Sequence, residues 1–563
     1  MLVSTVLQGR SDQAFPTFTP LELDRLRAFG PVRRFQAGER LIKAAEPGHG
    51  IIVVLSGEVG TVAITASESR FIFRHGAGSF TGELAQLSGR PSLVEATATA
   101  DGEAIMIPPE GLRAALVAEA TLGERIMRAM ILRRVTLLET GSGGPVIIGP
   151  ADDPDVLRIE GFLVRNSHPR QRLDRRTDID ALALAHGLGS DAIGLPIVIC
   201  PDGTLLHNPT EAELARCLGI VAPLDPDKLY DLTVVGAGPA GLATAVYAAA
   251  EGLSVLVLDC RWFGGQAGAS ARIENFLGFP TGISGQALMA RAHNQARKFG
   301  AELAIPVEAA SLAQHPDGGL AIALTNAEQI RTRSVVIACG ARYRRLGLAE
   351  VTDYEASSVH YWASPLEARL CAGQDVLLVG GGNSAGQAAA YLADQCARVT
   401  MLIRGESLES SMSRYLIARL KGLRNFELTT GAELVGLDGE DGRLNGVRLR
   451  HAASGCDHRL NVRHLFLFIG AEPNTDWLAG SGIKLDAKRF VLTGADAGPL
   501  RHALETSRRG VFAIGDVRAT SIKRVAAAVG EGAQVVAALH ASLAGMAGVP
   551  VTVPNPLAPT RTP

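Results

Sequence analysis

Residues 232–259 read LTVVGAGPAGLATAVYAAAEGLSVLVLD, which is an apolar strand, a glycine-rich turn, an alanine-rich helix and a second strand. Gly236, Gly238 and Gly241 give the spacing G-x-G-x-x-G. The first glycine permits the tight turn, the second lets the backbone approach a pyrophosphate, and the third allows close helix packing. Asp259 closes the second strand and can accept hydrogen bonds from a ribose diol. The stretch therefore predicts a dinucleotide held at a helix amino terminus.

A second turn of the same kind lies in residues 375–404, DVLLVGGGNSAGQAAAYLADQCARVTMLIR. The residues expected at this second dinucleotide are Gly380, Gly382, Asn383, Ser384, Ala385 and Arg404. Arg404 stands where an acidic ribose acceptor is usual, and its cation suits a 2'-phosphate. The sequence therefore favours NADPH over NADH, while a solvated loop charge is the alternative reading of Arg404. Two such units predict two Rossmann-like domains.

Residues 228–545 resemble the thioredoxin-reductase-like branch of the pyridine nucleotide-disulfide oxidoreductases. Beyond the two turns, GGQAGASARIENFLGFP at 264–280 is similar to the G-G-Q and I-E-N segments of that family. FIGAEPNT at 468–475 and GVFAIGDVR at 510–518 are similar to the segments that return to its FAD domain. The resemblance implies a flavoenzyme with FAD and NAD(P)H, and it favours a homodimer.

The same resemblance implies several further flavin contacts. Gln266 and Asn275 match residues that line the FAD site, and Asp516 matches a hydrogen-bond partner of the ribityl chain. In KRVAAAVGEGAQ at 523–534, a helix amino terminus is expected to aim its amides at the flavin pyrimidine oxygen. Those amides help to hold the negative charge of reduced flavin. The residues concerned are Arg524, Val525 and Ala526.

The cysteine pair of the family is missing. Its two positions fall on Ala363 and Leu366 in HYWASPLEARLCAGQDVLLVGGG, residues 360–382. Ser364 and Glu367 instead predict a helix-capping box. A second reading makes Glu367 a catalytic proton donor near the flavin. The seven cysteines show no C-x-x-C spacing, which argues against a disulfide framework and a zinc site, and no metal is predicted. They are Cys200, Cys217, Cys260, Cys339, Cys371, Cys396 and Cys456.

A small β-roll domain with a carboxyl-terminal helix is predicted first, from the short apolar runs of residues 31–110. GSFTGELAQLSGRPSLVEATA at 78–98 resembles the phosphate-binding cassette of cyclic-nucleotide-binding domains. Gly82 and Glu83 match that cassette, but Arg90 lies slightly early for the arginine that contacts the phosphate. Loss of such a contact costs about 1.5–3 kcal/mol. A cyclic nucleotide or other effector is thus a possible ligand, with weak affinity expected for cyclic AMP or GMP.

Residues 146–220 alternate strands and helices and look like a thioredoxin or glutaredoxin fold. GLPIVICPDG places Pro196 where that fold carries a cis-proline. The expected active-site loop, IIGPADDPDVLR at 147–158, contains no cysteine. A structural or docking module is therefore predicted rather than a redox module.

The whole chain of 563 residues is predicted to be a multidomain α/β protein. A formal charge of -2, without a basic run, argues against nucleic acid as a partner. No stretch of roughly 20 apolar residues and no signal peptide is recognised, so a cytoplasmic protein is expected rather than a membrane protein. The predicted parts are a cyclic-nucleotide-binding-like domain (1–142), a thioredoxin-like domain (143–222), an FAD domain (228–345 and 470–545), an NAD(P)H domain (346–469) and a disordered tail (546–563).

Taken together, these patterns predict an NADPH-dependent flavin oxidoreductase that passes hydride to FAD and then electrons to an acceptor. Ferredoxin, flavodoxin, a quinone or dioxygen could be that acceptor. One alternative is a thioredoxin-disulfide reductase that uses other thiols. Another is an effector-binding redox sensor with little turnover.

Overall fold

A computed structural model of the chain describes the following residues. They are 10–44, 46, 49–64, 69–82, 86–87, 91–141, 143–174, 196–221, 223–316, 318–355, 357–499 and 501–546. Glu83 and Arg90 of the predicted cassette, and the predicted tail beyond 546, lie outside these ranges.

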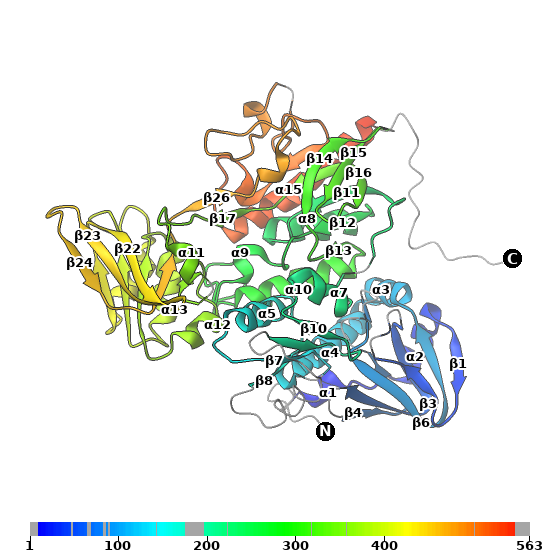
Figure 1. The fold of residues 1–563 in the computed structure, drawn as a ribbon. Helices are drawn as coiled ribbons and strands as arrows, with labels where there is room; N and C mark the ends of the chain where they lie inside the picture. The colour runs from blue at the N-terminus through cyan, green and yellow to red at the C-terminus, as the bar shows by residue number, and fades with distance from the viewer. Residues whose placement is uncertain are drawn as a thin grey trace.

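The first unit is an antiparallel β-roll, as predicted. Its strands are β1 (Val32–Phe35), β2 (Arg40–Ile42), β3 (Ile51–Ile64), β4 (Ser69–His75), β5 (Phe80–Thr81) and β6 (Val94–Ile107). Its helices are α1 (Ser11–Ala14), α2 (Pro20–Leu26), η2 (Arg27–Phe29), α3 (Pro109–Ala118) and α4 (Ala120–Thr140). The long strands β3 and β6 pair along almost their whole length, and α3 and α4 cover one side of the apolar core (Figure 1).

The second unit has a four-stranded sheet in the order β10-β9-β7-β8. Its elements are β7 (Val146–Ile148), α5 (Pro154–Arg165), β8 (Gln171–Leu173), β9 (Ile197–Ile199), β10 (Leu205–His207) and α7 (Glu211–Cys217). Strands β7 and β8 are parallel, whereas β9 is antiparallel to both β7 and β10. This is the strand order of the thioredoxin fold, and we call the unit the thioredoxin-like module. The peptide bond before Pro196 starts at Leu195, outside the described residues, so a cis bond there stays a prediction.

One disulfide was not predicted from the spacing of the cysteines. Cys200 follows β9 and Cys217 ends α7, and their sulfur atoms are bonded across a sequence separation of 17 residues. The spacing argued against a disulfide framework, and among the described residues this is a single bond. Cys200 and Cys217 are brought together because α7 packs back against the sheet through Leu214 and Ala215, a contact that short sequence spacings do not reveal.

The third unit is built on a sheet in the order β13-β12-β11-β16-β15-β14, with β27 beside β16. Its strands are β11 (Leu229–Val235), β12 (Val255–Leu258), β13 (Glu302–Ala304), β14 (Ala309–Gln314), β15 (Leu320–Leu324), β16 (Gln329–Ile337) and β27 (Val511–Ala513). Its helices are α8 (Pro239–Ala250), α9 (Gly265–Gly268), α10 (Gly285–Lys298) and α15 (Val525–Met546), with short turns η4 (Asp476–Leu478), η5 (Gly494–Asp496) and η6 (Gly515–Val517). Strand β11 is parallel to β12, to which the crossover helix α8 connects it, and also parallel to β16.

The fourth unit is inserted into the third. A parallel sheet has the order β18-β25-β19-β20-β21, and a three-stranded meander β22-β23-β24 packs beside it. The strands are β18 (Val359–His360), β19 (Asp375–Val379), β20 (Arg398–Leu402), β21 (Phe426–Thr429), β22 (Ala432–Glu440), β23 (Arg443–His451), β24 (Asp457–Leu460) and β25 (His464–Leu467). The helices are α11 (Val351–Tyr354), α12 (Pro365–Leu370), α13 (Asn383–Leu392) and α14 (Arg414–Lys421).

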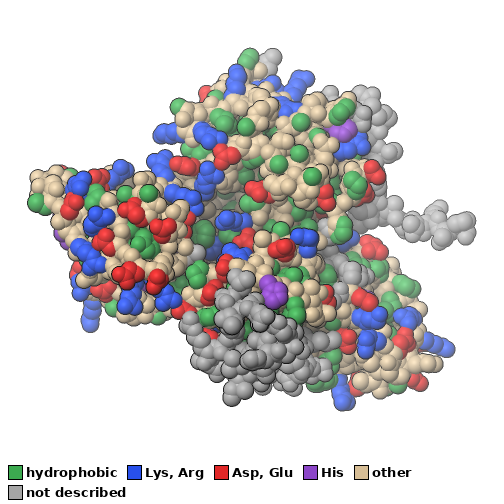
Figure 2. All heavy atoms as spheres, viewed as in Figure 1, with side chains coloured by type: hydrophobic (Ala, Val, Ile, Leu, Met, Phe, Trp, Pro, Cys, Tyr) green, Lys and Arg blue, Asp and Glu red, His purple; other side chains and the backbone are tan. Residues whose placement is uncertain are grey.

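The chain leaves the third unit and returns to it through two paired strands, β17 (Ala341–Tyr343) and β26 (Ala471–Pro473). These strands lie close to the predicted junctions at 345 and 470. The thioredoxin-like module lies between the β-roll and helices α10 and α12 (Figure 1). On the face shown in Figure 2, acidic and basic side chains are interspersed. Within the described residues, no helix is long and apolar enough to cross a membrane.

Candidate functional site

In the first glycine turn, residues 236–241, two glycines have no room for a side chain and the third has free space beside its backbone. Gly236 has a φ of +115°, and a Cβ there would lie 2.2 Å from the Ala338 carbonyl oxygen. A Cβ on Gly241 would lie 1.9 Å from the Gly236 carbonyl oxygen. At Gly238 the atom nearest to an added Cβ is 3.9 Å away, so the backbone is open there. The open position is the one expected to face the pyrophosphate.

Asp259, the predicted ribose acceptor, also holds this turn together. Its carboxylate accepts hydrogen bonds from the backbone N–H groups of Ala237 at 2.9 Å, Arg261 at 3.1 Å and Trp262 at 3.3 Å. Burial raises the pKa of Asp259, and these hydrogen bonds oppose the rise. A carboxylate has about four acceptor positions, so the same group retains capacity for a ribose hydroxyl.

The second glycine turn, residues 380–385, repeats this arrangement. Gly380 has a φ of +133°, and a Cβ there would lie 2.4 Å from the Phe468 carbonyl oxygen. Ala385 is fully buried under the first turn of α13. No atom lies within 4 Å of a Cβ placed on Gly382. This turn too leaves its middle glycine open to a ligand.

Three further residues predicted at the second dinucleotide, Asn383, Ser384 and Arg404, make different contacts in the structure. The Asn383 side chain accepts a hydrogen bond from the Ser413 N–H at 2.8 Å and so orders the loop before α14. Ser384 hydrogen-bonds the Tyr343 hydroxyl, whose pKa is raised by burial. Arg404 is exposed just beyond β20 and, among the described residues, makes no hydrogen bond or ion pair. Its cation is available to an anionic group.

The residues expected around the flavin are positioned by α9, η6 and α15. Gln266 donates a hydrogen bond to the Ala341 carbonyl, and Asn275 is exposed. Asp516 is partly buried without a side-chain hydrogen bond to any described residue, and burial raises its pKa while Lys523 opposes the rise. A carboxyl group in this state suits a hydroxyl donor.

The predicted contact between the flavin and the start of α15 involves the backbone amides of Arg524, Val525 and Ala526. The helix begins at Val525, and the Arg524 N–H already donates to the Ile522 carbonyl at 2.7 Å. Arg524 thus precedes the helix, and its contact with the flavin stays a prediction. Val525 and Ala526 occupy the first turn, where N–H groups have no partner within the helix.

Glu367 is a helix cap, as the capping prediction stated. Its Oε2 accepts from the Ser364 N–H at 3.0 Å and from the Ser364 hydroxyl, at the start of α12. Its Oε1 accepts from the Trp362 indole N–H at 2.9 Å. Both carboxylate oxygens thus have donors within the protein, which favours the cap over the alternative of a proton donor.

Glu367 also belongs to a contact that joins three units, which we call the arginine clamp: Arg165, Trp262, Trp362 and Glu367. The Arg165 guanidinium lies between two indoles, 4.3 Å from the ring centre of Trp262 and 4.2 Å from that of Trp362. Its Nη2 lies 3.6 Å from Glu367 Oε1. Burial lowers the pKa of Arg165, and Glu367 opposes that shift.

The clamp is reinforced on both sides. Arg165 ends α5 of the thioredoxin-like module, and the adjacent Asn166 donates to the Arg261 carbonyl at 3.2 Å. The carbonyl of the next residue, Ser167, accepts hydrogen bonds from the Arg134 guanidinium of α4 at 2.8 and 3.1 Å. The end of α5 therefore contacts the β-roll helix and both dinucleotide-type units. Sequence patterns did not reveal it, because the participating residues are distant in sequence.

The free thiols next to the site are poor nucleophiles. Burial raises the pKa of Cys339 to about 12 and that of Cys396 to about 11, and it raises the pKa of Cys371 as well. The thiolate is the reactive form of cysteine. Ala363, at the first position of the missing pair, is buried. Among the described residues, none of these thiols has a lowered pKa, so none takes the place of the missing cysteine pair near α12.

Two family models match the chain. The model for pyridine nucleotide-disulphide oxidoreductase matches residues 230–532, and that for the cyclic nucleotide-binding domain matches residues 32–119. The first match covers more than half of the chain and contains both glycine turns.

Curated proteins match over the same region. A thioredoxin reductase from Mycolicibacterium smegmatis is 30% identical over 305 residues, which cover 54% of this chain and 93% of that protein. An alkyl hydroperoxide reductase component from Pseudomonas putida is 30% identical over 312 residues, covering 55% of this chain and 58% of that protein. NADPH-dependent thioredoxin reductase 3 from Arabidopsis thaliana is 32% identical over 324 residues, which cover 56% of this chain and 58% of that protein. The chain thus spans little more than half the length of the two longer relatives.

Two solved structures share the fold of this region. The thioredoxin reductase of T. acidophilum has a TM-score of 0.52 and 27% identity, over 56% of this chain and 100% of that chain. The Lactococcus lactis thioredoxin reductase has a TM-score of 0.52 and 26% identity, over 56% of this chain and 99% of that chain.

Proposed function

The chain belongs to the pyridine nucleotide-disulphide oxidoreductase family, and from that premise we propose that it is an NADPH-dependent flavoenzyme that transfers electrons without a cysteine pair. Bound FAD would accept hydride from NADPH and pass electrons on directly, so that a ferredoxin, flavodoxin, quinone or dioxygen is the acceptor. The observation that carries this proposal is the pair of glycine turns. In each, a side chain at the first glycine would collide with a neighbouring backbone carbonyl, whereas the middle glycine leaves space for a ligand.

The chain's own groups have defined tasks in this proposal. Gly238 and Gly382 let the backbone approach two pyrophosphates at the amino ends of α8 and α13. Asp259 and Asp516 accept hydrogen bonds from ribose and ribityl hydroxyls. The first amides of α15, at Val525 and Ala526, stabilise negative charge on the reduced isoalloxazine. The reaction then depends on positioning and needs no protein nucleophile.

Rapid mixing tests the proposal. The purified chain is expected to carry flavin absorbance that NADPH bleaches within seconds under anaerobic conditions, and one of the four acceptor classes should restore it. Flavin that stays oxidised under NADPH would contradict the reductase function and favour the alternative of a redox sensor with little turnover.

Counting thiols separates direct transfer from a thiol relay. If electrons pass directly, anaerobic NADPH is expected to reduce bound flavin without creating new thiols, so Cys200–Cys217 stays oxidised. Denaturing the quenched sample in the presence of a thiol reagent measures this. Two additional thiols per chain would support the disulfide-reductase alternative, and loss of that increase in Cys217→Ser would assign it to this disulfide.

The preference for NADPH is a further part of the proposal. Arg404→Gln is expected to raise the KM for NADPH about 10-fold and leave the KM for NADH nearly unchanged, because one charge-assisted contact with the 2'-phosphate is worth about 1.5–3 kcal/mol. Steady-state kinetics with both coenzymes measures the change. Arg398→Gln is the matched control, since Arg398 starts the same strand and pairs with Glu427 at 3.3 Å. An equal change for both coenzymes would remove Arg404 from 2'-phosphate recognition.

We propose that the leading domain receives an effector. Its match to cyclic nucleotide-binding domains supports this role, and Gly82 helps to shape the predicted cassette with a φ of +127°. The Gly82 carbonyl accepts a hydrogen bond from the buried Arg133 at 2.8 Å, which connects the cassette to α4. Calorimetry with cyclic AMP and cyclic GMP, together with turnover assays, tests this role; no heat and no change in turnover would exclude both nucleotides.

A homodimer and a cytoplasmic location complete the proposal. Light scattering of the purified chain should give about twice the chain mass, and fractionation of the source cells should recover the protein in the cytoplasm. A monomeric mass would contradict the dimer.

A further inference from the structure

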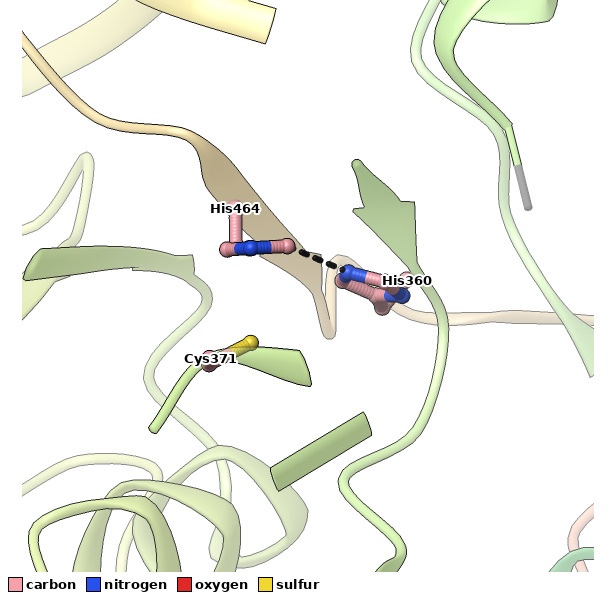
Figure 3. A group of neighbouring side chains, drawn as sticks. All are labelled: His360, Cys371 and His464. Carbon is pink, nitrogen blue, oxygen red and sulfur yellow. Dashed lines mark hydrogen bonds between the residues drawn. The ribbon is translucent and has the colours of Figure 1, made fainter. Parts of the chain in front are cut away.

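Three metal-binding side chains meet in the interior of the fourth unit, and they are not explained by the proposed function. His360 lies on β18, His464 starts β25, and Cys371 follows α12 (Figure 3). One ligand atom from each lies within 4.8 Å of the other two. His360 Nε2 and His464 Nδ1 are 3.1 Å apart and share a hydrogen bond. The three side chains are buried. We call them the His-His-Cys cluster.

The surroundings of the cluster are apolar. The two imidazoles stack with ring centres 5.3 Å apart, and Phe466 lies 4.8 Å from the His360 ring. Cys371 is packed in the core formed by α12, α13 and the sheet. Among the described residues, no carboxylate and no fourth His or Cys ligand completes the group. The cluster therefore offers two nitrogens and one sulfur inside a medium of low polarity.

The ligand types suit a metal site. A neutral imidazole binds a metal through the lone pair of its unprotonated ring nitrogen, and both rings are buried with one nitrogen each facing the other. Burial raises the pKa of Cys371, which is therefore a thiol in the absence of a metal. A metal ion has to displace that proton, as thiolate ligation requires.

Charge and ligand number discriminate between metals. With one thiolate and two neutral imidazoles, a monovalent ion gives a neutral ligand set, whereas a divalent ion leaves a net charge of about +1. The Glu367 carboxylate, whose charge acts on Cys371, is already paired with Arg165 and hydrogen-bonded to Trp362. Burying an uncompensated charge is costly. Structural zinc sites also use four protein ligands, while thiolate and imidazole ligands in a three-coordinate set suit copper. The cluster therefore fits copper(I) better than zinc.

We propose that the His-His-Cys cluster binds one copper(I) ion. On binding, a copper–sulfur bond replaces the S–H bond of Cys371, and the released proton leaves to solvent. The proton shared by the two histidines moves to a ring nitrogen that does not face the metal, so both facing nitrogens coordinate. The ion then joins β18, β25 and the end of α12 by three bonds. No oxidant or reductant is needed, since copper stays monovalent.

Copper retention by the full chain tests this assignment. The exposed thiols Cys260 and Cys456 are first replaced by serine, so that they do not contribute binding. The chain is produced with copper supplied during growth, because the site is buried, and a second sample is loaded anaerobically with copper(I). Both are dialysed against a copper(I) chelator, and metals are counted by mass spectrometry. One retained copper per chain is expected in at least one sample, and none in either would overturn the proposal.

Variants locate the metal. Cys371→Ser and His464→Gln are each expected to lower retained copper at least 10-fold, whereas Cys396→Ser is the matched control and should retain it. Cys396 is also a buried thiol of this core, but it is outside the cluster. Circular dichroism and flavin content check folding, and Cys371→Ala replaces Cys371→Ser if that variant misfolds. Equal retention in Cys371→Ser or Cys371→Ala, or zinc retained in preference to copper when both are supplied, would overturn the assignment.

X-ray absorption of the loaded chain gives a readout independent of occupancy. One sulfur and two nitrogen neighbours around copper are expected. A copper shell without sulfur would contradict ligation by Cys371.

Discussion

Gly382→Val is expected to slow flavin reduction by NADPH at least about 100-fold while FAD stays bound. The reason is steric: the backbone at Gly382 is open, with no atom within 4 Å of a Cβ. A larger side chain therefore fits the folded chain but occupies the space that the coenzyme pyrophosphate needs. Losing two charge-assisted hydrogen bonds of about 1.5–3 kcal/mol each accounts for the size of the effect.

Stopped-flow reduction at low NADPH concentration measures this change, and the flavin spectrum shows whether FAD is retained. Gly347→Val is the matched control, because Gly347 has no atom within 4 Å of its Cβ position and no restrictive φ, and it belongs to neither glycine turn. Reduction at the parent rate in Gly382→Val would mean that the second turn does not hold the coenzyme. Gly236→Ala is not an equivalent test, since its Cβ would collide with the Ala338 carbonyl and disturb the fold.

Removing Arg165 is expected to loosen the contact between the thioredoxin-like module and α12. Arg165→Ala takes away a buried cation that lies between two indoles and pairs with Glu367. Breaking a buried ion pair costs about 3–5 kcal/mol, although Glu367 keeps its donors Trp362 and Ser364. We therefore expect a local destabilisation of about 3 kcal/mol, at the lower end of this range.

Hydrogen exchange of the full chain measures that loosening, with faster exchange of about 100-fold expected at the end of α5 and in α12. Asp152→Ala is the control, because Asp152 joins the same two units through an exposed ion pair with Arg443 at 2.6 Å. Exposed pairs contribute about 0–1 kcal/mol, so little change is expected. Unchanged exchange in Arg165→Ala would show that the clamp does not hold the units together.

The local chemistry of the glycine turns could be predicted from sequence. G-x-G-x-x-G fixes which positions must lack a Cβ, and the structure closes Gly236 and Gly380 against the neighbouring carbonyl groups for that reason. The cap at Glu367 was equally predictable, because Ser364 and Glu367 are three residues apart and interact locally. For residues 146–220 the sequence predicted a compact α/β unit with two strands, and the structure adds two further strands in a four-stranded sheet.

Contacts between distant segments were not predictable in this way. Cys200 and Cys217 are paired by the return of α7, and His360 meets His464 because β18 and β25 are neighbours in a sheet. The exact start of α15 was also not predictable, since the sequence placed it within residues 523–534 and the structure begins the helix at Val525. A single sequence shows which residues can bind or react, but the topology decides which of them meet.

The hydrogen bonds from Arg134 to the Ser167 carbonyl have a mechanical consequence. Arg134 of helix α4 is hydrogen-bonded to the segment that follows α5, two residues after Arg165, whose guanidinium contacts Trp262 and Trp362. Because both contacts lie on one short segment, the position of α4 and that of the Arg165 guanidinium beside α12 are mechanically coupled.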